Sequence, residues 1–304
     1  RVNPMGIPVS IDPKNQPHQL YEDIDYREFW TGWQQAKLDQ AEHTIVRKLL
    51  PTSGHRLIDI GCGYGRLSDC YLDRFHQVVL FDGSLSLLQR AREKTGDRAI
   101  YVAGDLYHLP FRAGAFDSLL IVRVFHHVSN AQACFSELKR VLANRGTLVL
   151  TYRNKLYGMA ILKWLADRRT DSPFSIEPSG LDSTLISHHP QYIRQTLLQY
   201  GFSHPVSRGI GILDRLALKA GRFGKYAPTG SSFAPLFGKL MLAPWVFCKS
   251  VAAAGAPLLA DGGLDEILIC IRCGGALTRE TSGYTCQACQ RNYPLVDGIL
   301  DFRA

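Results

Sequence analysis

A cluster of glycines and one acid could hold a ligand against the backbone. Residues 57–66 read LIDIGCGYGR, so Asp59 stands two residues before Gly61, and glycine recurs at positions 63 and 65. Glycine permits positive φ and lets a ligand approach the main chain closely. A dinucleotide fingerprint G-x-G-x-x-G would need glycine at position 66, where the chain has Arg. The spacing excludes that fingerprint, and Asp59 suits a cationic ligand instead.

Two further acids follow the next two expected strands. Asp82 ends a short apolar strand, and Asp105 follows Gly104 after another. An acid at the end of the second strand can accept hydrogen bonds from both hydroxyls of a ribose. Asp105 could bind the exocyclic amine of adenine while Leu106 covers the face of the base. Such acids serve nucleotides in general and do not identify one ligand.

Four cysteines near the carboxyl end have the spacing of a metal site. Cys270 and Cys273 form one C-x2-C pair, and Cys286 and Cys289 form a second after twelve residues. Four thiolates fill the tetrahedral shell of zinc, so the ion would hold a small domain together and would not perform catalysis. Iron can take the same ligands. A redox dithiol is the alternative for either pair alone.

Alternating strands and helices position the glycines and acids. The glycine turn follows a buried strand, and the pattern from Arg66 predicts a helix. Strands are expected at 77–81 and 100–103, and a helix at 85–93 is capped by Ser84. This succession predicts a parallel sheet with helices on both faces.

The rest of the chain completes the expected plan. Helices are expected at 21–50, at 154–169 and from Pro190 to Gly201, and two antiparallel strands at 202–212 and 245–250. Residues 252–264 are rich in Ala, Gly and Pro, which is typical of a linker. We expect an N-terminal helical lid segment at 1–50, a catalytic domain at 51–251 with a basic helical insertion at about 213–242, the linker at 252–264, and a zinc ribbon at 265–304.

The stretch after the third strand makes a family resemblance specific. It contains L-P-F at 109–111, F-D at 116–117 and R-V-F-H-H at 123–127. Together with the glycine turn and the acids, residues 55–152 resemble the small-molecule branch of class I S-adenosylmethionine-dependent methyltransferases. Arg145-Gly146 departs from the usual Pro-Gly of that family. The resemblance implies an α/β fold with a Rossmann-like, seven-stranded, mostly parallel sheet, and S-adenosylmethionine as the methyl donor.

The same resemblance implies a set of site residues. Methyl transfer needs mainly positioning of donor and acceptor. If the acceptor must lose a proton, His126 or His127 is placed to take it, although a structural role is as reasonable for each. Arg123 could contact the donor or pair with an acid. The residues expected to bind the donor are Asp59, Gly61, Cys62, Gly63, Gly65, Asp82, Gly83, Asp105, Leu106, Val122 and Arg123.

The carboxyl-terminal segment carries a second resemblance. Residues 293–299 read YPLVDGI, and with the cysteine pairs they resemble the short zinc-ribbon proteins that activate methyltransferases acting on tRNA, ribosomal RNA and release factors. The resemblance implies an activator in cis or a docking surface. Gln290 stands where those proteins have glycine after the second pair, whereas Gly274 is present after the first.

Composition narrows the classes of protein. The chain has 304 residues, 46% of them hydrophobic, and a net charge of +8, so it can bury a full core. The sequence has no apolar run long enough for a transmembrane span, so we expect neither a span nor a secretory signal. The cysteine usage favours a reducing, cytoplasmic location. Residues 208–249 carry seven basic residues and one acid, which could meet RNA, anionic lipid or an acidic substrate.

Three functions follow from these patterns. The first is methyl transfer to a small or lipophilic metabolite, with a structural zinc ribbon as docking or activating module and peripheral membrane contact possible through residues 213–250. A second is a translation-related methyltransferase acting on RNA or a protein factor. The third is a non-catalytic binding subunit, which the intact glycines and acids disfavour.

Overall fold

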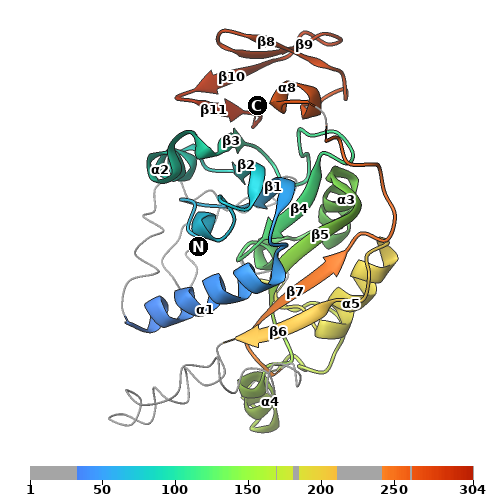
Figure 1. The fold of residues 1–304 in the computed structure, drawn as a ribbon. Helices are drawn as coiled ribbons and strands as arrows, with labels where there is room; N and C mark the ends of the chain where they lie inside the picture. Colours follow the sequence, from blue (N-terminus) through green and yellow to red (C-terminus); the bar gives the residue numbers. More distant parts are fainter. Residues whose placement is uncertain (1–32, 169, 181–184, 211–241, 261, 304) are drawn as a thin grey trace.

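The structure, a computed structural model, describes residues 33–168, 170–180, 185–210, 242–260 and 262–303 (Figure 1). The first 32 residues of the expected lid segment and nearly all of the expected basic insertion therefore lie outside the described residues. Among the helices in the described ranges, none has the length and apolar character needed to cross a bilayer.

Seven strands form the sheet that the sequence predicts. Their order is β6-β7-β5-β4-β1-β2-β3, with β1 to β5 parallel and β7 antiparallel to both β5 and β6. This arrangement confirms the Rossmann-like prediction. The strands are β1 (Gly54–Ile60), β2 (Phe75–Asp82), β3 (Ile100–Ala103), β4 (Phe116–Ile121), β5 (Leu142–Arg153), β6 (Val206–Ile210) and β7 (Trp245–Val251).

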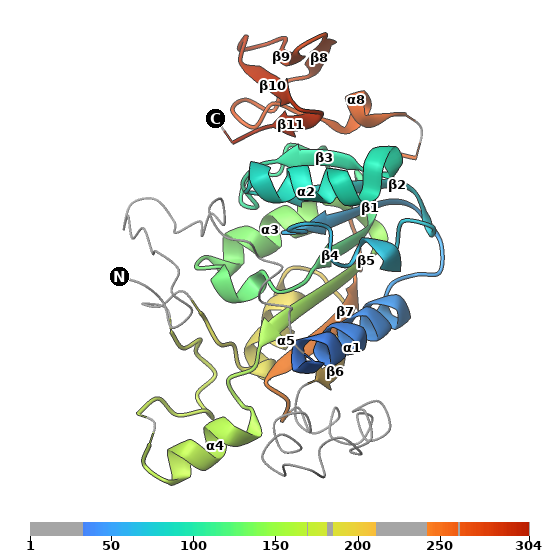
Figure 2. The same ribbon diagram turned by 90° about the vertical axis from the view of Figure 1, so that its left-hand side faces the viewer.

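Helices cover both faces of the sheet (Figure 2). The helices α1 (Trp33–Leu49) and α2 (Leu85–Thr95) pack on one face, and α3 (Ala131–Val141) and α5 (Pro190–Gln199) on the other. Because side chains alternate along a strand, Leu57 joins the core cluster under α1 and α2, whereas its neighbour Ile58 joins the cluster under α3 and α5. The sheet thus separates two hydrophobic cores.

Two expected helices differ from the sequence prediction. After the glycine turn the chain forms a short 3-10 helix, η2 (Ser68–Cys70), in place of an α-helix. The turns there close with i to i−3 hydrogen bonds, which suit a short connection. The helix expected at 154–169 is α4 (Gly158–Leu165), because Asn154 uses its side chain to bind the backbone of Leu156 and Ala243 instead of joining a helix.

The ribbon continues the same sheet. After α8 (Leu264–Ile267), its strands are β8 (Leu277–Glu280), β9 (Gly283–Cys286), β10 (Asn292–Val296) and β11 (Ile299–Asp301). Strand β11 lies parallel to β3, with Leu300 opposite Val102, so the seven strands become part of an eleven-stranded sheet. The next residue, Phe302, donates its N–H to the Ala103 carbonyl at 2.8 Å and is buried in the core shared with α3.

The segment expected as a linker is bound along the first domain. The guanidinium of Arg56, fully buried, donates to the carbonyls of Leu259 at 3.1 Å and Gly262 at 3.0 Å. The Asn144 N–H also donates to the carbonyl of Ala256 at 2.8 Å. These bonds satisfy a buried charge with backbone oxygens and fix the path of the chain toward the ribbon.

We predict that Phe302→Ala destabilises the whole protein and not the ribbon alone. The Phe302 ring is 1% exposed and stacks on Tyr293 with ring centroids 4.3 Å apart. Emptying such a site costs about 3–5 kcal/mol. Urea unfolding followed by circular dichroism should show the main transition at lower urea, whereas Leu295→Ala, at a side chain 42% exposed, should leave it in place. An unchanged main transition in Phe302→Ala would show that the ribbon does not stabilise the first domain.

Candidate nucleotide site and metal centre

The glycine turn adopts a conformation that requires glycine. Gly61, Gly63 and Gly65 have φ of 69°, 55° and 70°, in the left-handed region. A Cβ on Gly61 would lie 2.1 Å from a methyl group of Val124, so the turn after β1 packs directly against the segment that follows β4. The carboxyl ends of these two strands therefore share one edge of the sheet.

Asp59 lies buried beneath the turn. Its side chain is 3% exposed and accepts a hydrogen bond from the Tyr71 hydroxyl at 2.5 Å. Burial raises the pKa of the Asp59 carboxyl to about 7, although the Tyr71 hydroxyl and Arg66 act to lower it. A cation placed beside this carboxyl would stabilise its ionised form, which burial disfavours.

Asp82 ties the second strand to the glycine turn. Its two carboxylate oxygens accept the backbone N–H of Gly63 at 2.8 Å and of Ser84 at 3.0 Å. The backbone carbonyl of Asp82 accepts the N–H of Gly104 at 3.1 Å, which joins this loop to the one that carries Asp105. The acids predicted at three strand ends thus occur at one edge and in connected loops.

Asp105 shapes the loop after β3. Its carboxylate accepts the N–H of Tyr107 at 2.9 Å and lies 3.1 Å from the His108 ring. Leu106 is half-buried against the core. Gly83, also half-buried, has its carbonyl 3.5 Å from the Arg303 guanidinium. The end of the chain therefore reaches the loop that follows β2.

A buried ion-pair network that the sequence did not predict links α1 to this edge. Glu42 on α1 is fully buried and binds Arg66, directly after the glycine turn, at 2.6 Å. It also binds Arg123, whose Nε donates at 2.8 Å. Arg66 pairs with Asp39 as well. In the sequence, Glu42 looks like an exposed residue of a helix. Its role is visible only in the structure, where Arg66 and Arg123 from distant segments bind it.

Arg123 therefore pairs with an acid, the second of the two roles considered for it. Its φ of 62° is unusual for a residue other than glycine. Its guanidinium lies 3.7 Å above the Trp245 ring, and its backbone N–H donates to the Thr151 hydroxyl at 2.8 Å. Val122, 6% exposed, packs in the core cluster under α1. Cys62 is also buried, and burial raises the pKa of its thiol well above the ordinary value.

The two histidines follow β4 on a short 3-10 helix, η4 (Phe125–His127). Their rings lie 4.0 Å apart, and the His126 ring meets Trp245 edge-on at 5.0 Å. His126 is 7% exposed, and His127 is half-buried. Burial lowers the pKa of His126 well below its usual value, and the neighbouring His127 and Arg123 act in the same direction. His126 is thus neutral at physiological pH and can donate or accept a hydrogen bond.

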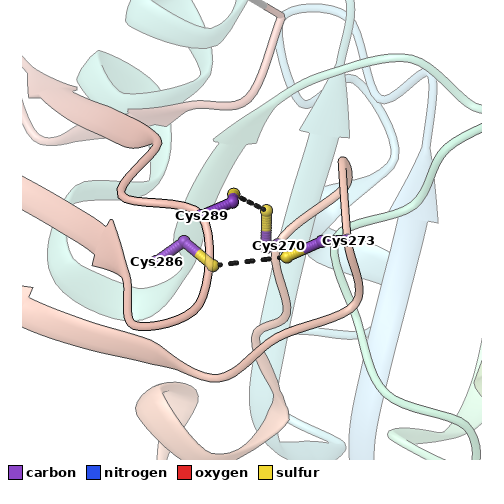
Figure 3. Close-up of side chains that lie close together, drawn as sticks. All are labelled: Cys270, Cys273, Cys286 and Cys289. Atoms are coloured by element: carbon purple, nitrogen blue, oxygen red, sulfur yellow. Dashed lines mark hydrogen bonds between the residues drawn. The ribbon is translucent and has the colours of Figure 1, made fainter.

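The four cysteines of the ribbon converge on one point (Figure 3). Their sulfur atoms all lie within 4.8 Å of one another, with Cys270 and Cys289 3.6 Å apart and Cys273 and Cys286 3.5 Å apart. Tetrahedral zinc with Zn–S bonds of about 2.3 Å places its sulfurs roughly 3.8 Å apart. The donor set therefore fits zinc.

Both cysteine turns have the backbone that a metal knuckle needs. Gly274 has φ of 72°, as expected, and Gln290 adopts the same left-handed region with φ of 56° despite its side chain. The Tyr293 hydroxyl lies 3.1 Å from the Cys270 sulfur and also binds the Ile271 N–H at 3.2 Å. The tyrosine of the YPLVDGI segment thus supports the cysteine cluster.

Comparison with known proteins agrees with this geometry. Residues 58–150 match the family model described as a methyltransferase domain. A malonyl-[acyl-carrier protein] O-methyltransferase of Legionella pneumophila is 36% identical over 106 residues, which cover 34% of this chain and 37% of that protein. A demethylmenaquinone methyltransferase of Thermobifida fusca is 30% identical over 136 residues, covering 40% and 58% respectively. The chain spans about half the length of these curated relatives or less.

Solved structures share the fold. An S-adenosylmethionine-dependent methyltransferase of Mesorhizobium loti aligns with a TM-score of 0.51 at 20% identity, over 69% of this chain and 97% of that one. A chain from the complex of the Haloferax volcanii Trm112 methyltransferase activator with a methyltransferase aligns with a TM-score of 0.52 at 18% identity, over 75% and 98%. The described part of the chain has the fold of S-adenosylmethionine-dependent methyltransferases.

We predict one zinc ion per chain in the purified protein, measured by plasma mass spectrometry. Cys273→Ser should lose the metal and lower the temperature at which the ribbon unfolds, because metal binding at such a site is folding free energy. Cys134→Ala, at a buried cysteine in α3 away from the cluster, should keep the metal. A metal-free protein that unfolds at the same temperature with and without a chelator would contradict the assignment.

Proposed function

We propose that the protein is an S-adenosylmethionine-dependent methyltransferase that acts on a small or lipophilic metabolite and carries a structural zinc ribbon. The observation that supports this most is the joint placement of Asp59, the glycine turn, Asp82 and Asp105 at one edge of the sheet. They lie within the segment that matches the methyltransferase domain.

The residues present fit S-adenosylmethionine. It would supply a methyl group already activated by a sulfonium. Asp59, buried with a raised pKa, would pair with the ammonium group of its amino-acid part. Asp82 would accept from the ribose hydroxyls, and Asp105 with Leu106 would hold the adenine. The glycines would let the backbone approach the ligand, which a side chain at Gly61 would prevent.

The protein's own contribution is positioning and the exclusion of water. Glu42 joins α1 to Arg66 beside the glycine turn and to Arg123 after β4, so the helix is held against both loops that flank the reaction site. Arg123 in turn lies against Trp245 at the start of β7. Fixing these elements holds donor and acceptor in reactive geometry, where methyl transfer gains most of its rate.

Two observations favour a small or lipophilic acceptor. The relatives at 36% and 30% identity are named for methylating a malonyl group on a carrier protein and demethylmenaquinone. In addition, four of the nine large hydrophobic side chains that are exposed among the described residues lie on α4, and two more follow it in the chain. Helix α4 is at the opposite end of the molecule from the ribbon (Figures 1 and 2). The six side chains are Met159, Leu162, Trp164, Leu165, Phe174 and Ile176.

The ribbon would act in cis by holding the loops that bind the donor. Strand β11 pairs with β3 up to Ala103, directly before the loop of Gly104 and Asp105. A Cβ on Gly104 would lie 2.9 Å from the Phe81 ring and 3.7 Å from the Cβ of Phe302, so the loop is packed against both side chains. Loss of the ribbon would free this loop.

A translation-related methyltransferase is the second candidate. The ribbon favours it, because one structural neighbour comes from a complex with the Trm112 methyltransferase activator. In this chain, however, β11 already occupies the outer edge of β3. The ribbon therefore has a position within the protein that requires no separate partner.

We predict that wild-type protein binds S-adenosylmethionine and that Asp82→Ala weakens binding at least about tenfold, since hydrogen bonds to a charged group contribute about 1.5–3 kcal/mol. Gly63→Asp should abolish binding, because the residue has positive φ and would place a side chain in the turn. Asp97→Ala, at an exposed acid after α2, is the matched control and should bind as wild type does. Equal affinity in all four proteins, measured by titration calorimetry, would refute the cofactor assignment.

We further predict that the affinity rises with pH up to about 7 and then levels off. Asp59 is neutral below its pKa of about 7 and attracts the ammonium group only when ionised, so affinity falls by up to roughly tenfold per pH unit below that value. Tyr71→Phe should move the midpoint upward, because the hydroxyl lowers this pKa. Asp59→Asn should bind weakly at every pH. An affinity in the wild type that is constant between about pH 5 and 8 would contradict the role of Asp59.

A further inference from the structure

Two buried imidazoles at the site's edge have ring nitrogens without hydrogen-bond partners. His188 is 1% exposed, and neither of its nitrogens makes a hydrogen bond of full geometry, although the ring interacts with the Phe125 backbone. His126 is 7% exposed, and its Nδ1 is not bonded. Only two other buried side-chain atoms in the described residues share this property, Asp117 Oδ1 and Ser118 Oγ on β4. Buried polar atoms in proteins are nearly always paired. The concentration of three such atoms in two rings points to a polar ligand.

The backbone brings the two histidines together from distant parts of the sequence. The Ile186 N–H donates to the His126 carbonyl at 2.7 Å, and the His188 N–H donates to the Arg153 carbonyl at the end of β5 at 2.8 Å. The His188 ring lies 4.9 Å from the Phe125 ring, next to His126 in the chain. The segment before α5 thus places His188 beside η4, and Gly61 contacts Val124 just before η4.

The surroundings of the pair are aromatic and cationic. The His188 ring stacks on Tyr192 at 5.7 Å, and the His126 ring meets Trp245 at 5.0 Å. Arg123, Arg153 and His127 all act to lower the pKa of His126, after the larger effect of burial. Burial also lowers the pKa of His188 to about 4, with the Phe125 backbone acting in the opposite direction. Both rings are therefore neutral at physiological pH, and each can donate one N–H and accept one hydrogen bond.

These features suit an aromatic acceptor with an acidic hydroxyl. Flat rings bind against aromatic side chains, the unpaired nitrogens can bind a hydroxyl group, and the N–H of a neutral imidazole can donate to an oxyanion. Resting on the proposed function, we propose that His126 and His188 bind the hydroxyl of a phenolic methyl acceptor. The acceptor binds as its phenolate: the O–H bond breaks, its electron pair stays on oxygen, and the proton passes to water. The neutral His126 ring donates an N–H to the phenolate oxygen. His188 keeps the oxygen in place as a hydrogen-bond partner.

4-Nitrophenol tests this site, because its phenolate absorbs visible light and its phenol form does not. Wild-type protein saturated with S-adenosylmethionine should bind 4-nitrophenol saturably and should shift its titration to lower pH. His126→Gln and His188→Phe should each weaken binding roughly tenfold or more and remove the shift. 4-Nitroanisole, which lacks the O–H group, should bind wild-type protein weakly.

Two controls separate this proposal from folding and from the cofactor assignment. His188→Phe should keep or raise the thermal unfolding temperature, because it replaces an unpaired buried polar ring with an apolar one. His76→Phe, at an exposed histidine on β2, should bind 4-nitrophenol as wild type does. His126→Gln and His188→Phe should both bind S-adenosylmethionine as wild type does. If wild-type protein itself fails to bind S-adenosylmethionine, the proposed function is overturned, and not the phenol site alone. Absence of 4-nitrophenol binding by wild type, or equal binding by both site variants, would overturn the phenol site.

Discussion

Backbone pairing along both edges of β3 is the constraint on which the rest of the structure depends. This strand has only four residues, with β2 on one side and β11 of the ribbon on the other. Without β11, its outer edge would expose unpaired N–H and C=O groups. The loops that follow β2 and β3 carry Asp82 and Asp105, and they are bonded to each other. Whatever fixes β3 therefore also fixes two of the acids proposed to bind the methyl donor.

Features that depend on local sequence were predictable. Parallel strands end at a common edge, so acids placed after successive strands had to lie near one another. Glycine at positions 61, 63 and 65 indicated a left-handed turn, and the structure has one. The cysteine spacing likewise predicted four converging thiolates, because each C-x2-C pair forms its own local turn. The alternation of strands and helices predicted a parallel sheet with helices on both faces, and the family resemblance supplied the expectation of seven strands.

Features that depend on contacts between distant segments were not predictable. Glu42 looks like a surface residue of a helix, and its burial follows only from Arg66 and Arg123 meeting it. His188 stands beside a helix start, where His189 caps α5, so the sequence gives it no signal of a site. The expected helix after Gly65 became 3-10 turns whose Tyr71 reaches back to Asp59. Docking of the ribbon on β3 likewise needed the three-dimensional structure.

We propose above all that this site transfers methyl groups to a small or lipophilic molecule. The direct measurement is to incubate the protein with a cell extract and S-adenosylmethionine labelled in its methyl group, and then to separate lipids and metabolites from RNA and protein. We predict label in the lipid and metabolite fraction with wild-type protein and no label with Gly63→Asp. Label confined to RNA or protein, or no label in any fraction, would contradict it.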